Sequence, residues 1–224
     1  MTINATDLRM HTIGTERTGV STGVLRSVVP DAADDDEVDG RNAVDTVRAR
    51  AAVTELLEAL GRDPRSEHLA DTPRRVVDAF IEQLTQNDFS PTTFPNTEGY
   101  DELVLVRDIP FHSLCEHHLL PFQGIAHVGY IPGDRLIGLS KLARAVDFFS
   151  HDLQVQERLT RQIANWIESE LDPVGVGIVM EAEHTCMTIR GIQARGALTV
   201  TSTFTGVLKE RPDLREQFFC GSRH

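Results

Sequence analysis

Two short clusters of cysteine and histidine are the residues of this chain best suited to chemistry. Cys115 and His118 stand three residues apart, a spacing that lets both side chains turn onto one ion, and Cys186 can supply a third ligand. Three protein ligands with a fourth position left open are typical of catalytic zinc, whereas structural zinc usually has four. His117 and His184 lie beside these ligands and remain free to move protons near neutral pH. The spacing therefore predicts a zinc site with the parts for hydrolysis.

The same residues also allow an interpretation without metal. A buried cysteine most often acts as a small apolar core residue, and a single histidine usually lies on the surface or is a satisfied core group. The Cys-x-x-His spacing is weak by itself, and the long gap to Cys186 matches no zinc-finger pattern. We favour the metal site because two His-Cys clusters, one of which includes Glu116, are harder to explain as core residues.

The segment from Gly138 to Arg144 predicts a second site, for an anion. Ser140 is a plausible N-cap, which places Lys141 and Arg144 in the first turn, on the same face of a helix. Free backbone N–H groups, the positive helix end and two cations then form an anion site. A solvated helix end is the more common alternative. However, Lys141 is one of only two lysines in a chain of net charge −12.

Three further charged residues could contribute to binding. Arg190, four residues after Cys186, could add positive charge close to the metal. Arg75, at the start of an earlier helix, could do so from farther away or from another subunit. Glu157 is expected in the first turn of a long helix, where acidic residues commonly complement the helix dipole. The functional alternative is a carboxylate that accepts the paired N–H donors of a guanine-like ring edge.

Composition narrows the class of protein and of partner. The net charge of −12 and the sequence pI of about 5.1 argue against a general nucleic-acid binder, which needs a basic surface. No apolar run approaches the roughly 18 residues of a membrane span, and residues 1–10 lack the apolar centre of a signal peptide. Three cysteines fit a reducing compartment. We therefore expect a cytoplasmic protein without nucleic-acid or membrane partners.

Hydrophobic periodicity predicts the elements that position these residues. We expect a disordered acidic arm over residues 1–42, a helical region over 43–100 and a catalytic domain over 101–224. In the last region, two strands, two helices and two strands follow one another, which suits an α+β domain with antiparallel hairpins and helices on one face. Antiparallel pairing could bring both Cys-His clusters to one sheet end. The expected ranges are helices from Val44 to 60, 72–84, 140–149 and 155–171, a loop at 91–100, and strands at 103–106, 123–131, 174–180 and 197–204.

Several longer motifs, taken in order, resemble the GTP cyclohydrolase I family between about residues 43 and 219. The resemblance implies the tunnelling fold, in which an antiparallel sheet carries two helices on one face and joins the sheets of neighbouring subunits into a barrel. It also implies a toroidal homodecamer of two pentamers, with active sites between subunits. The motifs are Cys115-Glu116-His117-His118, Tyr130-Ile131-Pro132, Ile137-Gly138-Leu139-Ser140-Lys141, Gln154-Val155-Gln156-Glu157-Arg158-Leu159-Thr160, His184-Thr185-Cys186 and Arg190-Gly191-Ile192.

The resemblance further implies a reaction: GTP and water give 7,8-dihydroneopterin triphosphate and formate, the first step of tetrahydrofolate and pterin biosynthesis. Water activated by zinc attacks C8 of the purine. The resemblance implies that Zn²⁺ is bound by Cys115, His118 and Cys186, and that protons are transferred at guanine by His184 and at the ribose side by His117. It implies assistance near the ribose and the opened ring by Ser140 and Gln156, and anchoring of guanine by Glu157. It also implies that the triphosphate is bound by Lys141, Arg144, Arg190 and, from a neighbour, Arg75.

The chain departs from the family pattern at two positions. Asp78 stands where some members carry a lysine directed at the phosphates, and Thr185 stands where some relatives carry an aromatic residue. Rival interpretations fit less well. A pterin synthase of the same fold would use three histidines, a nitrile reductase would use a nucleophilic cysteine without metal, and a zinc deaminase needs a Pro-Cys-x-x-Cys segment that this sequence lacks. A non-catalytic ring-forming module would need a fourth protein ligand to zinc.

Overall fold

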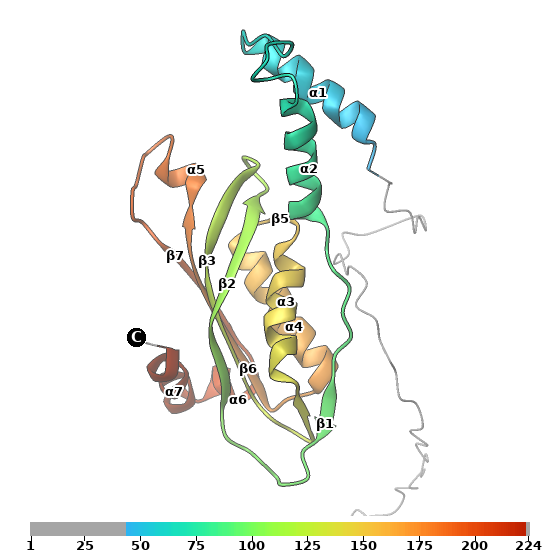
Figure 1. Cartoon of the computed structure of the whole chain (residues 1–224). Helices are drawn as coiled ribbons and strands as arrows, with labels where there is room; N and C mark the ends of the chain where they lie inside the picture. The colour runs from blue at the N-terminus through green and yellow to red at the C-terminus, as the bar shows by residue number, and fades with distance from the viewer. Residues whose placement is uncertain (1–43, 223–224) are drawn as a thin grey trace, which may run out of the picture.

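A five-stranded sheet forms the centre of the fold in the computed structural model, which describes residues 44–222 (Figure 1). The predicted acidic arm, residues 1–42, lies outside the described residues. The strand order is β5-β2-β3-β6-β7, and every neighbouring pair is antiparallel except β2 and β5. The strands of this sheet are β2 (Val104–Cys115), β3 (Leu120–Ile131), β5 (Leu153–Gln154), β6 (Gly175–His184) and β7 (Thr199–Phe204), and a separate ribbon pairs β1 (Thr93–Pro95) with β4 (Arg135–Ile137).

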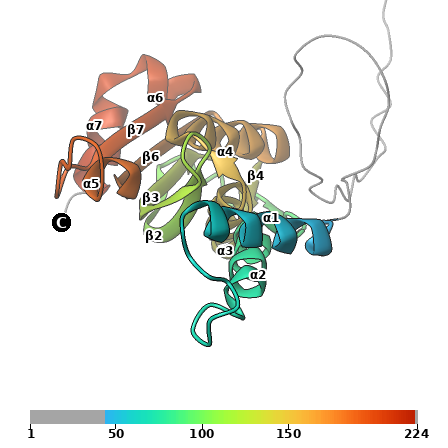
Figure 2. The same cartoon turned by 90° about the horizontal axis from the view of Figure 1, so that it is seen from above.

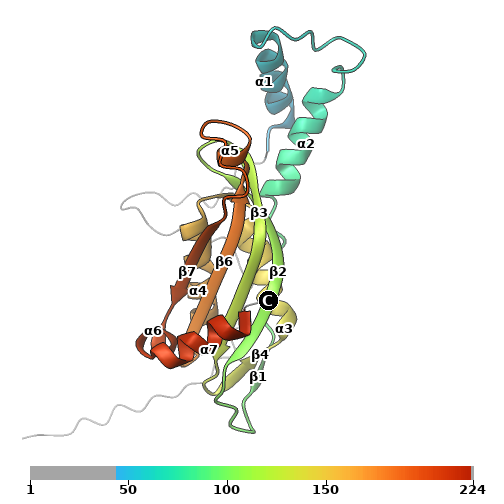
Figure 3. The same cartoon turned by 90° about the vertical axis from the view of Figure 1, so that its left-hand side faces the viewer.

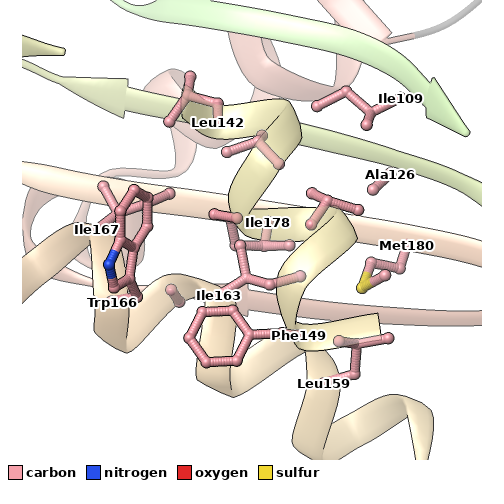
Figure 4. Packing of buried hydrophobic residues seen from close by; sticks show 14 of the residues in the cluster. Ile109, Ala126, Leu142, Phe149, Leu159, Ile163, Trp166, Ile167, Ile178 and Met180 are labelled. Carbon is pink, nitrogen blue, oxygen red and sulfur yellow. The ribbon is translucent and has the colours of Figure 1, made fainter. Parts of the chain in front are cut away.

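Two helices, α3 (Leu139–Ser150) and α4 (Gln156–Leu171), pack against one face of the sheet and confirm the α+β prediction. Their apolar residues recur at helical spacing, as Leu159, Ile163 and Ile167 do along α4, and all three are fully buried. Figure 4 shows these side chains meeting Ile178 and Met180 of β6. This core holds the first turn of α4 against the sheet.

The opposite face carries helix α7 (Pro212–Ser222), which follows the short α6 (Gly206–Glu210); sequence patterns predicted neither (Figure 2). Phe218 of α7 is fully buried over two glycines of the sheet. A Cβ added at Gly129 or at Gly177 would lie 2.9 Å from the Phe218 ring. Glycine is therefore needed at these positions for α7 to approach the sheet.

The N-terminal helices α1 (Thr46–Ala59) and α2 (Thr72–Leu84) pack against each other and project beyond the end of the sheet at which α5 (Thr185–Thr188) lies (Figure 3). The predicted ranges are close, but Asp71 rather than Thr72 is the N-cap of α2. No residue of α1 is buried. Across residues 44–222, every helix is too short or too polar to cross a bilayer.

Strand β2 is three times as long as its predicted core of 103–106. A register shift between Val106 and Ile109 interrupts the alternation of buried and exposed residues, and Asp108 there has a positive φ of 58°. Pairing with β3 resumes beyond this bulge and continues to Cys115. The predicted loop at 91–100 likewise contains a strand, β1, which is stabilised by its partner β4 rather than by its own sequence pattern.

Candidate metal centre and substrate site

A tight turn between β2 and β3 brings the first cluster of predicted ligands together. Cys115 is the last residue of β2 and pairs with Leu120, the first residue of β3. The backbone N–H groups of His118 and Leu119 both donate to the Cys115 carbonyl, at 3.2 and 2.8 Å. This turn folds His118 back along the strand, so that its Nδ1 lies 3.6 Å from Cys115 Sγ.

The second cluster reaches the same end of the sheet through β6. His184 ends β6 and pairs in register with Phe122 of β3, and α5 then carries Cys186. Thr185 Oγ1 donates to the Pro121 carbonyl, which ties the start of α5 to β3. The candidate ligand atoms of Cys115, His118 and Cys186 consequently lie within 4.8 Å of one another. Antiparallel pairing thus joins the clusters as predicted, and no fourth residue between 44 and 222 belongs to this group.

The donor set of this cluster suits a thiophilic divalent metal such as zinc. Cys115 is buried, and Cys186 is partly buried. Burial raises the pKa of the Cys186 thiol, and the nearby Cys115 thiol raises it further, while the charge of Arg190 acts in the opposite direction. A metal ion favours the thiolate forms that burial disfavours, so two adjacent thiols and an imidazole form a fitting site. Arg190 is therefore close enough to Cys186 to act on it, as the sequence suggests.

His184 is held beside the cluster by contacts on its edge and on its face. Its Nε2 lies 2.8 Å from Gln156 Oε1, and its ring stacks on Phe122 at a centroid distance of 4.4 Å and an interplanar angle of 6°. Burial lowers the pKa of His184, and the charge of Glu157 opposes this change. The neutral imidazole is therefore favoured, and Glu157, in the first turn of α4, lies within electrostatic range of it.

Gln156 lies inside the protein rather than at an open surface. It is 1% exposed, and its Nε2 contacts the Met180 and Thr199 carbonyls at 3.1 and 3.0 Å and Thr201 Oγ1 at 3.1 Å. Its Oε1 faces His184. The side chain expected to assist near the substrate ribose is thus occupied by contacts within the chain.

Arg158, another residue of the first turn of α4, contacts the loop between β2 and β3 (residues 116–119, called the metal loop below). The sequence motif included Arg158, but no role was predicted for it. Its guanidinium lies 2.6 Å from the Glu116 carboxylate, and its Nε donates to Gln154 Oε1 at 3.1 Å. Glu116 separates Cys115 from His117, and its carboxylate lies 3.8 Å from His117 Nε2. The side chain of His117 is 64% exposed. The first turn of α4 therefore contacts both Cys-His clusters, His184 through Gln156 and Glu116 through Arg158.

The predicted anion site lies at the other end of the sheet within one chain. Gly138, rather than Ser140, is the N-cap of α3, and Ser140 is an exposed residue inside the helix. Ile137, just before α3, donates its N–H to the Tyr130 hydroxyl at 3.2 Å. Tyr130 is eight residues along β3 from Phe122, the residue stacked on His184, which corresponds to about 27 Å. Lys141, in the first turn of α3, consequently lies toward the Tyr130 end of β3, while Arg144 lies near the middle of this helix.

The side chain of Arg75 contacts Asp71 of its own helical segment rather than a residue of the Cys-His cluster. It lies on the projecting helix α2, where its side chain is 70% exposed and its Nε is 3.0 Å from Asp71 Oδ2. Asp78, the departure noted in the same helix, pairs with Arg74 at 2.7 Å and with Arg50 at 3.4 Å. The charges of α2 are thus partly engaged with one another.

Fold and cluster together define an α+β protein with three candidate metal ligands, whose number and type are those of a catalytic zinc centre. Residues 49–223 match the family model of GTP cyclohydrolase I, and the chain belongs to this family of enzymes. It is 50% identical to a "GTP cyclohydrolase 1" of Synechococcus sp. (strain JA-3-3Ab) over 84% of this chain and 83% of that protein.

Other relatives agree with this assignment. The "GTP cyclohydrolase 1" of Aquifex aeolicus (strain VF5) is 49% identical over 79% of this chain and 96% of its own length. That of Corynebacterium glutamicum is 50% identical over 78% of this chain and 92% of its own. An apo archaeosine synthase QueF-Like aligns at a TM-score of 0.40 and 15% identity, over 47% of this chain and 94% of that one, which is too weak a likeness to inform the fold.

Proposed function

We propose that this protein is a zinc-dependent hydrolase that converts GTP and water to 7,8-dihydroneopterin triphosphate and formate, the first step of tetrahydrofolate and pterin biosynthesis. The observation that carries the proposal is the convergence of Cys115, His118 and Cys186 within 4.8 Å in a member of the GTP cyclohydrolase I family. The names of its relatives at about 50% identity support the same substrate.

Zinc, held by these three residues, would supply Lewis acidity that lowers the pKa of a water molecule to about 7. The rest of the chemistry belongs to side chains of the chain. His184, fixed by Phe122 and Gln156, delivers a proton to the imidazole part of guanine. His117, exposed beside the ligands, serves proton transfer at the ribose side, and Glu116 lies within reach of its ring.

Charged side chains hold the two ends of GTP. Glu157 is exposed at the start of α4 and acts electrostatically on His184, which supports its role in accepting the N–H donors of the guanine edge. Arg190, close to Cys186, binds the triphosphate from the metal side. Lys141 and Arg144 bind it from the first turns of α3, with Ser140 beside them and Arg75 of a neighbouring subunit as a further cation.

The distance between the metal cluster and α3 supports a site shared between subunits. About 27 Å along β3 separates the residues beside His184 from those beside Ile137, so one chain does not offer both ends of the site to one nucleotide. A second copy of α3 next to the cluster solves this problem. We therefore propose a tunnelling-fold assembly, a decamer of two pentamers. We also propose that the chain is divided into an arm over residues 1–42, a helical region over 43–100 and a catalytic domain over 101–224.

Exposed apolar side chains support assembly in addition. β7 is an edge strand of the sheet, on which Val200 is 58% exposed, and edge strands need pairing or protection. Val47 of α1 is 78% exposed, and Leu60, the C-cap residue of this helix, is 65% exposed. Apolar residues in these positions become buried when sheets of neighbouring subunits join and when the projecting helices find partners.

The main alternative is a module in which zinc only holds loops together. Structural zinc is usually closed by four protein ligands. The group found in residues 44–222 has three, and an ordered histidine, His184, lies beside it without belonging to it. A hydrolytic centre accounts for both features.

Incubation of zinc-replete protein with GTP tests the proposal. We expect formate release together with pterin fluorescence, loss of both after treatment with a chelator, and recovery when zinc is returned. Absence of turnover in fully assembled protein that contains one zinc ion per chain would rule out the proposed activity and leave the structural-zinc alternative.

A further inference from the structure

The side-chain amide of Gln156 has only one possible orientation. Its Nε2 faces two backbone carbonyls, those of Met180 and Thr199, at 3.1 and 3.0 Å, and carbonyl oxygens only accept hydrogen bonds. Exchange of the amide N and O would place an oxygen against both carbonyls inside a residue that is 1% exposed. The Oε1 atom therefore points to His184, at 2.8 Å from its Nε2.

This orientation dictates where His184 carries its proton. An amide oxygen is an acceptor only, so the contact requires a proton on His184 Nε2. Neutral imidazole has one N–H, and the other nitrogen, Nδ1, then has a free lone pair. Stacking on Phe122 at an interplanar angle of 6° holds the plane of the ring. A half-turn of the ring that returns it to this plane would place the carbon Cε1 against Gln156 Oε1 in place of the Nε2–H donor, and so would lose the hydrogen bond.

We propose that Gln156 is a positioning residue that fixes His184 in the tautomer protonated on Nε2, so that Nδ1 is the atom that exchanges a proton with the substrate. The catalytic part rests on the proposed function. In that step Nδ1, which carries no proton in the neutral ring, accepts a proton from the attacking water as the water oxygen bonds to C8, and passes this proton to a ring nitrogen of guanine. His184 thereby returns to the neutral Nε2–H tautomer.

Gln156 accepts from Nε2–H in both protonation states, so it orients the ring throughout the cycle without contact with GTP. This role differs from direct assistance at the ribose. Truncation of a residue that binds GTP in the ground state raises KM, whereas truncation of a residue that acts only through His184 lowers kcat and leaves KM for GTP unchanged.

Nitrogen-15 NMR of the zinc-loaded full chain, labelled only at histidine, tests the tautomer. Long-range proton–nitrogen correlations distinguish Nε2 from Nδ1, and a His184→Gln variant assigns the signal. We expect His184 with its proton on Nε2. A neutral His184 that carries its proton on Nδ1 would overturn the proposal, whether or not the protein hydrolyses GTP. If the expected tautomer is found in protein without GTP turnover, the proposed function fails while the positioning role stands.

Two substitutions test whether Gln156 is the cause. Gln156→Met removes the acceptor with little change in size, and we expect a mixture of His184 tautomers together with a fall in kcat of roughly 10- to 100-fold at unchanged KM. Gln156→Glu keeps an acceptor oxygen and should retain the Nε2–H tautomer. Gln162→Met makes the same change in the same helix, where the partner is Gln154 rather than His184, and should leave the His184 spectrum unaltered. An unaltered spectrum in folded Gln156→Met, or a tautomer mixture in Gln156→Glu, would contradict the proposal.

Discussion

A mixture of two defective variants can show whether the candidate site is shared between subunits. Lys141→Ala removes a cation from α3, and Cys186→Ala removes a ligand from the metal cluster. Ile137, just before α3, contacts Tyr130, which is about 27 Å along β3 from Phe122 beside His184, so we expect one GTP molecule to take these two groups from different subunits. Loss of a hydrogen bond to a charged group costs about 1.5–3 kcal/mol, so Lys141→Ala alone should weaken binding of the triphosphate by roughly 10- to 150-fold.

If the proposed shared site is correct, each site of a randomly mixed ring takes its metal cluster from one subunit and its Lys141 from the next. Half of the subunits have an intact cluster and half have an intact lysine, so about a quarter of the sites contain both. We therefore expect hybrid assemblies to recover about a quarter of wild-type formate release at subsaturating GTP. If instead each site lay within a single subunit, every site would contain one of the two substitutions, and activity would not recover.

The two variants are co-expressed with different affinity tags, and hybrid assemblies are purified through both tags. The measurement is their rate of formate release. Cys186→Ala mixed with Cys115→Ala is the control, because both substitutions damage the same cluster and no intact site can form. Hybrids of Lys141→Ala and Cys186→Ala that are no more active than the separate variants would refute the shared site. Full activity of Lys141→Ala alone would remove Lys141 from the site.

Three further predictions concern the metal, its supporting contacts and the fold. Cys186→Ala should abolish both zinc binding and turnover, while His184→Ala should retain zinc and lose turnover; equal zinc loss, measured by elemental analysis, would mean that the roles are wrong. Arg158→Met should lower turnover by roughly 10- to 100-fold, because the Glu116 carboxylate beside the metal loop loses its partner at 2.6 Å, and Glu116→Gln should cost less; full activity of Arg158→Met would exclude this support. Gly177→Ala should reduce the free energy of unfolding by about 1–3 kcal/mol in denaturant melts, because the new Cβ meets aromatic rings at 2.9 Å, and an unchanged stability would show that α7 shifts freely.

The grouping of the candidate ligands could be predicted from sequence because it depends on residue type and short spacing. Cys115, His118 and Cys186 needed only one further condition, that β3 pairs with both β2 and β6, and runs of strand-forming residues indicated those strands. Their ends were harder to predict. The bulge at Asp108 breaks the alternation inside β2, so periodicity reveals only the first part of that strand.

Other features depend on long-range geometry that no local pattern contains. Lys141 and Arg144 were correctly placed near the start of a helix, but the position of that start, at the Tyr130 end of β3, follows from the tertiary fold. The contacts on which the proposed positioning role of Gln156 rests could not be predicted either, because the carbonyl groups of β6 and β7 meet this side chain only in the folded protein. Helix α7 packs on glycines, which carry no hydrophobic signal.

X-ray absorption at the zinc edge of active protein tests the central claim most directly. We expect two sulfur ligands at about 2.3 Å and nitrogen at about 2.0–2.1 Å, with the remaining coordination from a light atom that is not part of the protein. Loss of one sulfur in Cys115→Ala and in Cys186→Ala would assign both thiolates. A shell without sulfur, or one closed by four protein ligands in a turning-over enzyme, would contradict the proposed centre.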